Sequence, residues 1–382
     1  MADYDAASLL MTSNSVSFEA ALPLVRSKRI DSIDALRGFD MFWIIGGDHL
    51  LRSLPDIQDN AITRTLAGQM EHVPFAGLHA YDLIYPIFVF IVGAAIPFSL
   101  PRIIEREGRP SALRRVIIRG IILFLLGVFY MGGVANGFSN VYFAGVLHRI
   151  GVAYLFTGLL FLFFRPRTLA IIAGTLLILY WALLTFVPVP GIGHASYEHG
   201  RNLAYWIDQH YLPGQKFEGT ILSTLAAVAN CLIGIFAGLI LKDSSRSELA
   251  KVRALAVFGF ALLVAGLLWS FQFPIIKLLW TSSYVLIACG IGTILLSLFH
   301  LIIEVLNFRT WSRPFIWIGS NAITIYLLSS VANFPKLANR VVGGNVATFL
   351  GPWAATVNAL VALTMAIWVV WLLYQRKVFI RL

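Results

Sequence analysis

The segment EHVPFAGLHAYDLIYPIFVFIVG, residues 71–93, places His72, His79 and Asp82 immediately before a long apolar run. An imidazole can act as a general acid or base near neutral pH, or can carry an acyl group as a nucleophile. A neighbouring carboxylate can orient such an imidazole. The segment therefore indicates either catalysis by one of the histidines or a polar loop without a chemical role.

A second group of polar residues lies inside an apolar stretch near the N-terminus, IDALRGFDMFWIIGGDHLL. Asp34, Arg37 and Asp40 are spaced three apart, so they share one face of a helix and can neutralise one another. Charged groups are expensive inside a membrane and often mark a functional site. These three residues form either an interfacial ion cluster or an arginine held by carboxylates to meet a ligand phosphate.

Asp48 and His49 lie at the far end of the same stretch, after a pair of glycines at 46–47 that we expect to let another backbone approach. Other polar residues are predicted at the same end of the molecule, where they could bind an acceptor substrate: His148, Arg149, Trp280, Ser283 and Asn321. A single histidine near a membrane interface is usually structural, whereas several polar and charged residues at the same end favour a site that faces the outer compartment.

The opposite end is rich in arginine. Basic residues there either anchor the protein to anionic headgroups or bind the phosphates of a nucleotide-like donor. The candidates for donor binding are Arg37, Arg313, Arg115 and Arg119. A basic site at one end and a histidine-centred site at the other indicate that a chemical group passes through the molecule.

The elements that position these residues are membrane-spanning helices. Hydrophobic residues make up 58% of the 382 positions and charged residues 13%, against about 25% charged in soluble domains. Runs of about 20 apolar residues are long enough to cross a ~30 Å hydrocarbon core, and repeated runs predict an all-α bundle. We expect about ten spans, near 33–52, 81–100, 113–132, 142–164, 168–187, 219–241, 255–273, 279–303, 314–334 and 353–374.

The distribution of Lys and Arg predicts the orientation. Nineteen of them fall on one side of the ten-span arrangement and seven on the other, so both termini are expected in the cytoplasm. We expect a multi-pass protein of the inner membrane with a cytoplasmic tail at 1–28 and a single transmembrane domain at 29–382. The net charge of +10 is mostly a topology signal and requires no nucleic-acid partner.

Cofactor motifs are missing from the sequence. Cys231 and Cys289 both lie inside predicted spans and are expected to be small buried residues. Neither a metal-binding spacing of Cys and His nor a glycine-rich nucleotide fingerprint in a strand–helix context is found. We therefore expect no metal and no bound nucleotide cofactor. The oligomeric state, including a homo-oligomer, is left open.

Six ordered blocks resemble the heparan-α-glucosaminide N-acetyltransferase family and its bacterial transmembrane relatives. They are RIDSIDALRGFDMFWIIGGDHL, HVPFAGLHAYDLIYPIFVFIVG, LHRIGVAYLF, FEGTILSTLAAVANCLIGIFAGLIL, LWTSSYVL and PFIWIGSNAITIY. The second block is similar to the family pattern His-x-x-Trp-x-Gly-x-x-x-x-Asp-Leu-x-x-Pro-x-Phe-x-Phe. The resemblance extends from about Arg29 to the ninth predicted span.

The resemblance implies acetyl transfer from cytoplasmic acetyl-CoA to the amino group of a glucosamine residue across the membrane. His72 occupies the catalytic position of the family and His79 does not, while Asp82 matches the motif aspartate. Asp48 stands where lysosomal members have an asparagine near the reaction site. Phe75 replaces the usual tryptophan, so a different acceptor surface is expected. The large lumenal N-terminal region of the lysosomal enzymes is also absent here, which favours a free amino sugar or a short saccharide.

The chemistry is consistent with this transfer. The phosphates of CoA cannot enter hydrocarbon, but its thin pantetheine arm could carry the thioester to His72 through a polar channel. His72 could then act as a general base or as a transient acetyl carrier, with Asp48 or Asp82 orienting it. Two other functions remain open: O-acylation of a surface polysaccharide or lipid-linked sugar, and proton-coupled sugar transport.

Overall fold

The computed structural model describes residues 30–135 and 137–379. The expected tail at 1–28 lies outside the described residues. The described residues from Asp31 onward form one unit by their internal contacts. Across the described residues the regular structure is helical, and one isolated antiparallel bridge joins Ala76 to Ile276. The all-α fold class predicted from the apolar runs is confirmed.

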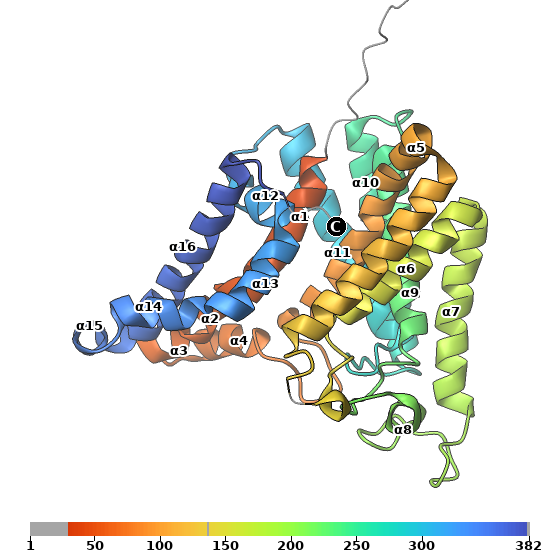
Figure 1. Ribbon diagram of the computed structural model, residues 1–382, viewed down its shortest axis with the longest axis horizontal. Helices are drawn as coiled ribbons and strands as arrows, with labels where there is room; N and C mark the ends of the chain where they lie inside the picture. The colour runs from red at the N-terminus through yellow and green to blue at the C-terminus, as the bar shows by residue number, and fades with distance from the viewer. Residues whose placement is uncertain (1–29, 136, 380–382) are drawn as a thin grey trace, which may run out of the picture. The chain divides into compact units, whose positions relative to one another are not determined.

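The chain order of the elements is seen in Figure 1. The N-terminal half contains Asp31–Phe42 (α1), a π-helical turn at Trp43–Gly47, Asp48–Arg52 (α2), Leu54–Ile57 (α3), Ala61–Gln69 (α4), a 3₁₀ turn at Ala80–Leu83, Ile84–Tyr130 (α5), a 3₁₀ turn at Phe138–Asn140, Val146–Phe163 (α6) and Pro166–Phe186 (α7). The C-terminal half contains Leu203–Tyr211 (α8), Thr224–Lys242 (α9), Glu248–Ser270 (α10), Ser282–His300 (α11), a π-helical turn at Leu301–Val305, Arg313–Ser320 (α12), Ala322–Ala332 (α13), Phe334–Val342 (α14), Asn345–Leu350 (α15), a 3₁₀ turn at Gly351–Trp353 and Ala354–Gln375 (α16).

Within the described residues, seven helical segments are long and apolar enough to cross a membrane, or eight if α12 and α13 form one broken span. The segment Ala80–Tyr130 counts once although it covers the second and third predicted spans, and its backbone leaves the helical region at Gly108 (φ 81°, ψ 169°). The first predicted span is not among the seven. The total of ten and the orientation of the termini therefore stay predictions.

The first predicted span is interrupted rather than continuous. Its π-helical turn contains Gly46 at φ 131°, a conformation that favours glycine. The expectation that the glycine pair admits another backbone is wrong. A side chain at Gly46 would meet nothing within 4 Å, and one at Gly47 would meet the ring of Phe42 from the same segment. The glycine is needed for the backbone turn, which places Asp48 at the start of α2.

Glycines bring the central helices into close contact elsewhere. A Cβ at Gly93 of α5 would lie 1.9 Å from the carbonyl oxygen of Cys231 on α9, and one at Gly234 would lie 2.1 Å from that of Phe90. Small residues of this kind are typical of helix interfaces in membranes. The spanning windows of α9 and α10 are 72% and 22% buried. Helix α9 therefore lies inside the bundle, while α10 exposes apolar side chains such as Val257 and Phe260, as expected for contact with lipid.

Candidate active site

The loop that carries His72 is attached to the loop between α10 and α11. The bridge between Ala76 and Ile276 is extended by a hydrogen bond from Gly77 N to the carbonyl oxygen of Ile275 at 2.9 Å. Gly77 has φ 120°, which is why glycine is required at this turn. This pairing sets residue 277 beside His72.

Asp82 is the centre of the polar contacts in this region. Its side chain is fully buried, and Oδ2 accepts backbone N–H groups from Val73 at 3.3 Å and His79 at 3.1 Å. Oδ1 lies 2.8 Å from Nδ1 of His72 and 3.0 Å from Nζ of Lys277. We call His72, Asp82 and Lys277 the His72 cluster. The His72 side chain remains 56% exposed, so its imidazole is held at one edge and accessible at the other.

The contacts of Asp82 favour one tautomer of His72. A carboxylate only accepts hydrogen bonds, so a contact of 2.8 Å with Nδ1 is favourable when Nδ1 carries the proton. The other ring nitrogen, Nε2, then has a free lone pair. With Nδ1 protonated, the ammonium of Lys277 donates to Oδ1 of Asp82 and makes no hydrogen bond to the nearby Nδ1. This tautomer is the one that a general base or nucleophile requires.

Lys277 is one of the seven Lys and Arg residues on the less basic side of the predicted arrangement, and the sequence does not predict its role in this cluster. Its Nζ also lies 2.8 Å from Nδ1 of His72. Burial lowers the pKa of Lys277 below its ordinary 10.5, while the charge of Asp82 acts in the opposite direction. No local pattern marks Lys277, because it lies 195 residues from Asp82; only its position two residues before the LWTSSYVL block hinted at it.

Tyrosines extend the His72 cluster. The Tyr284 hydroxyl donates a 2.6 Å hydrogen bond to the backbone carbonyl of Asp82, and the ring of Tyr81 lies 4.9 Å from that of His72. Asp48 is buried, pairs with Arg52 at 3.5 Å and interacts electrostatically with Tyr81. Asp48 is thus linked to the cluster through Tyr81, without a direct contact to His72 among the described hydrogen bonds.

A group of aromatic and cationic side chains lies beside the His72 cluster. Trp280 is buried with φ 58°, a strained conformation for this residue type, and its backbone N–H donates to the carbonyl of Lys277. The guanidinium of Arg149 lies 4.4 Å from the Trp280 ring and donates to the carbonyl of Gly219 at 3.2 Å. Arg149 and Trp280 are therefore brought beside the His72 cluster. The Ser283 hydroxyl donates to the carbonyl of Phe273 at 2.6 Å and so secures the same loop.

The remaining acceptor candidates occupy separate positions. His49 is exposed on α2. His148 is buried against the ring of Phe124 at 4.8 Å, and neither of its ring nitrogens has a hydrogen-bond partner among the described residues. Asn321 is buried at the 81° bend between α12 and α13, where both of its amide atoms also lack a partner in the described part of the chain.

Comparison of the sequence with known proteins assigns the chain to a family. The family model for "Heparan-alpha-glucosaminide N-acetyltransferase, catalytic" matches residues 29–266. The chain belongs to this family. It is 26% identical over 379 residues to heparan-alpha-glucosaminide N-acetyltransferase of Mus musculus, covering 81% of the chain and 56% of the relative. The Homo sapiens protein of that name is 27% identical over 325 residues, covering 67% of the chain and 48% of the relative.

The chain thus spans about half the length of these two relatives. The matched range includes His72, Asp82, His148 and Arg149, whereas Lys277 lies beyond it. The family match therefore covers the histidine and the aspartate of the His72 cluster but not its lysine. The lysine is assigned to the cluster by tertiary contacts alone.

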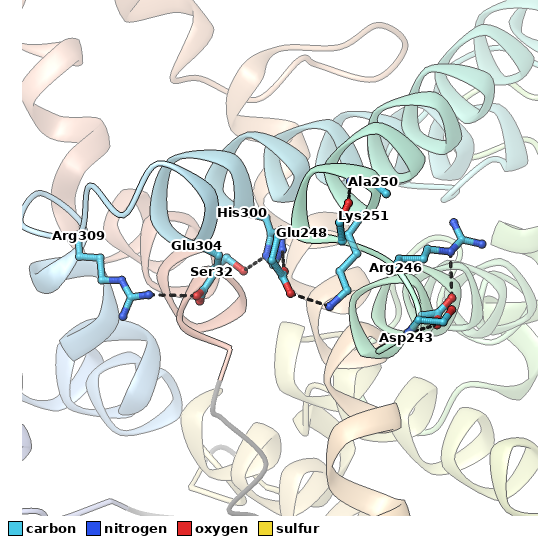
Figure 2. Close-up of polar contacts among 11 residues, drawn as sticks. Ser32, Asp243, Arg246, Glu248, Ala250, Lys251, His300, Glu304 and Arg309 are labelled. Atoms are coloured by element: carbon cyan, nitrogen blue, oxygen red, sulfur yellow. Dashed lines mark hydrogen bonds and ion pairs between the residues drawn. The ribbon is translucent and has the colours of Figure 1, made fainter.

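A different polar network occupies the other end of α11. The Ser32 hydroxyl donates to Nδ1 of His300 at 3.1 Å, Nε2 of His300 lies 2.7 Å from Glu248, and Glu248 pairs with Lys251 at 3.0 Å (Figure 2). We call these four residues the His300 network. Since α11 has 19 residues, its two ends are ~28 Å apart. The His72 cluster and the His300 network are therefore separated by about the thickness of a hydrocarbon core.

The four donor-binding candidates lie in different environments. Arg37 pairs with Asp34 at 3.1 Å and reaches the carbonyl of Gly319 at 3.5 Å. Arg313 is exposed at the start of α12. The two remaining arginines, on α5, are Arg115, which pairs with Glu107 at 2.6 Å, and Arg119, which lies 4.6 Å from the ring of Tyr154. Of the four, Arg37 lies on the α1–α12 contact, five residues along α1 from Ser32.

Proposed function

We propose that the protein transfers the acetyl group of acetyl-CoA to the amino group of glucosamine or of a glucosamine-containing saccharide. The single observation that carries this proposal is the His72 cluster, an accessible imidazole held by a buried carboxylate in a member of this acetyltransferase family. The names of the two relatives support an amino-sugar acceptor. The proposed reaction takes place in the inner membrane, with both termini in the cytoplasm.

In direct transfer, the acceptor nitrogen attacks the thioester carbonyl carbon and forms the C–N bond. The C–S bond breaks and CoA leaves as a thiolate. The proton lost by the nitrogen passes to Nε2 of His72 and from there to the thiolate. Asp82 stabilises the imidazolium formed in this step, because its Oδ1 accepts from Nδ1.

A two-step reaction uses the same atoms. Nε2 of His72 attacks the thioester first and CoA leaves as a thiolate. The amine then attacks the acetyl-imidazole, the bond from the carbonyl carbon to Nε2 breaks, and the proton lost by the amine passes to Nε2 and on to the thiolate. Lys277 lies 3.4 Å from Nε2, so its ammonium is close enough to stabilise negative charge on the carbonyl oxygen in either route. The two routes differ in whether an acetylated enzyme accumulates when the acceptor is withheld.

The donor is proposed to enter from the end of the His300 network, where the nucleotide stays in water while the thioester reaches inward. Arg37 and Arg313 are the proposed contacts of the CoA phosphates, with Arg115 and Arg119 as further candidates. The proposed acceptor residues are His49, His148, Arg149, Trp280, Ser283 and Asn321. Asp48 is proposed as a catalytic residue that acts on His72 through Tyr81. Burial of the Asn321 amide without a partner at the helix bend supports its contact with a polar ligand, as in other discontinuous membrane helices.

The proposal is tested with purified full-length protein by measuring CoA release from acetyl-CoA in the presence of glucosamine, N-acetylglucosamine or a neutral sugar. We expect release with glucosamine only. The His72→Ala variant should lose at least 10²-fold in kcat, the usual value of acid–base or nucleophilic help, and His79→Ala should retain most activity. The N–H of His79 serves Asp82 through the backbone, which the alanine variant keeps.

Three results would contradict the proposal. Release of CoA with the neutral sugar would indicate O-acylation, and glucosamine accumulation in vesicles without acetyl-CoA would indicate transport. Normal turnover by His72→Ala would show that the histidine was assigned wrongly.

A further inference from the structure

A buried carboxylate outside the His72 cluster has one oxygen that accepts no hydrogen bond from the described residues. Glu218, in the connection between α8 and α9, is 5% exposed. Its Oε1 accepts hydrogen bonds from Nδ2 of Asn202 and from the backbone N–H of Gly200 at 3.3 Å. Its Oε2 has no hydrogen-bond partner among the described residues and lies 3.5 Å from Nε2 of His199. One oxygen of this carboxylate is held by hydrogen bonds, and the other faces only the exposed imidazole of His199.

Asp208, on the neighbouring helix α8, shows what a purely structural carboxylate looks like here. It is also fully buried, and both of its oxygens are used: Oδ2 accepts from Thr220 N at 2.6 Å and Oδ1 from Ile221 N at 3.0 Å. Buried polar atoms are normally paired, and burial of an unpaired charge is costly. Oε2 of Glu218 accepts no hydrogen bond among the described residues and approaches only the exposed imidazole of His199, which indicates room for a ligand that donates hydrogen bonds.

Two separate contacts place Glu218 near the His72 cluster. First, the adjacent Gly219 lies against the backbone of Leu278, since a Cβ on Gly219 would be 2.8 Å from its carbonyl oxygen. Leu278 is the neighbour of Lys277 in the chain. Second, the ring of Phe75 lies 5.0 Å from that of His199, and Phe75 follows His72 by three residues. The loop that carries Lys277 thus borders Gly219, and the loop that carries His72 borders His199, the neighbour of Glu218 in space.

Further unpaired polar atoms surround the same segment. Nη1 of Arg149 and Nε1 of Trp280 are buried without a hydrogen-bond partner among the described residues. Arg149 contacts both Gly219 and Trp280. A sugar with an amino group and several hydroxyls supplies both donors and acceptors for these atoms.

We propose that Oε2 of Glu218 binds the amino group of the acceptor in its ammonium form, making Glu218 the residue that selects a cationic sugar. This inference rests on the proposed function and adds the residue that recognises the amine. The ammonium has three N–H donors, and its charge complements the carboxylate. The ammonium has no lone pair, so it first loses one proton to solvent. His72 accepts the second proton when the C–N bond forms and passes it to the CoA thiolate. Glu218 thus binds the acceptor and His72 performs the chemistry.

The test compares binding of glucosamine with binding of its neutral product, N-acetylglucosamine, in full-length wild-type protein and in Glu218→Gln. The glutamine keeps Oε1 for Asn202 and Gly200 but replaces the negative oxygen by an amide N–H₂. We expect Kd and KM for glucosamine to rise about 10- to 100-fold, the usual value of a charge-assisted hydrogen bond. The Kd for N-acetylglucosamine and the KM for acetyl-CoA should stay within threefold. A purely structural role would change all of these constants together.

A matched control is Glu198→Gln, which alters an exposed carboxylate in the connection between α7 and α8 that pairs with Arg201 at 3.2 Å. It should leave all constants unchanged. If Glu218→Gln does not fold, Glu218→Asp keeps the charge and shortens the reach; a smaller but still glucosamine-specific rise in Kd is then expected. An equal rise for both sugars, or no rise for glucosamine, would overturn the assignment. Absence of acetyl transfer in the wild type would refute the proposed function alone, because the binding comparison still tests Glu218.

Discussion

Replacement of Asp82 by asparagine tests whether the buried carboxylate orients His72. Asp82 accepts four hydrogen bonds, two from backbone N–H groups at 3.1 and 3.3 Å and two from His72 and Lys277 at 2.8 and 3.0 Å. Asparagine has one oxygen and one N–H₂ group. Whichever way the amide turns, its N–H₂ faces a pair of donors.

The expected loss can be worked from these contacts. The hydrogen bond from His72 to a charged acceptor contributes about 1.5–3 kcal/mol. The mispaired amide adds about 1–3 kcal/mol for the donors that lose their acceptor. Together these terms amount to roughly 3–6 kcal/mol, and each ~1.4 kcal/mol in the barrier is a factor of ten. We therefore expect kcat for acetyl transfer to fall by about 10²- to 10⁴-fold.

The assay is CoA release at saturating acetyl-CoA and glucosamine, accompanied by the thermal unfolding midpoint of the purified protein. Asp82→Asn should also be less stable, because the ammonium of Lys277, which is only 17% exposed, loses its counter-charge. Adding Lys277→Gln should restore stability and leave kcat low. Asp59→Asn is the control, since Asp59 belongs to an exposed pair with Arg64. A folded Asp82→Asn protein with kcat within tenfold of wild type would refute the orienting role.

Three further predictions concern topology, donor binding and pH. In sealed vesicles, a single cysteine at Ser196 should react with an impermeant reagent from outside and one at Ser245 should not; the reverse would overturn the positive-inside orientation. Alanine at Arg37 or Arg313 should raise KM for acetyl-CoA more than KM for glucosamine, and an unchanged donor KM in both would return them to structural roles. Burial lowers the pKa of Lys277 below its ordinary 10.5, so the unfolded chain binds more protons between the lowered value and 10.5. The free energy of unfolding should therefore rise with pH through that window, and equilibrium unfolding of Lys277→Met should lack this rise; an identical pH dependence would contradict the assignment.

Local sequence was sufficient for the helical class and for one chemical pair. Apolar runs determine where helices form in a membrane, because an unpaired backbone is too costly in lipid. His72 and Asp82 are ten residues apart at the start of such a run, so their proximity depends on one turn and on the first residues of one helix. The first span was predicted as continuous, but a π-helical turn at Gly46 interrupts it. Hydropathy could not predict this interruption, because it carries no information about the backbone dihedral angle φ.

Tertiary structure decided which distant side chains complete the site. Lys277 reaches His72 across 205 residues through a backbone bridge between two loops, and neither loop has a periodic pattern that predicts its partner. The bend at Asn321 and the half-paired carboxylate of Glu218 are likewise visible only when every hydrogen-bond partner is known. Hydrophobicity and spacing act within one segment, whereas the pairing of buried polar atoms depends on how segments meet.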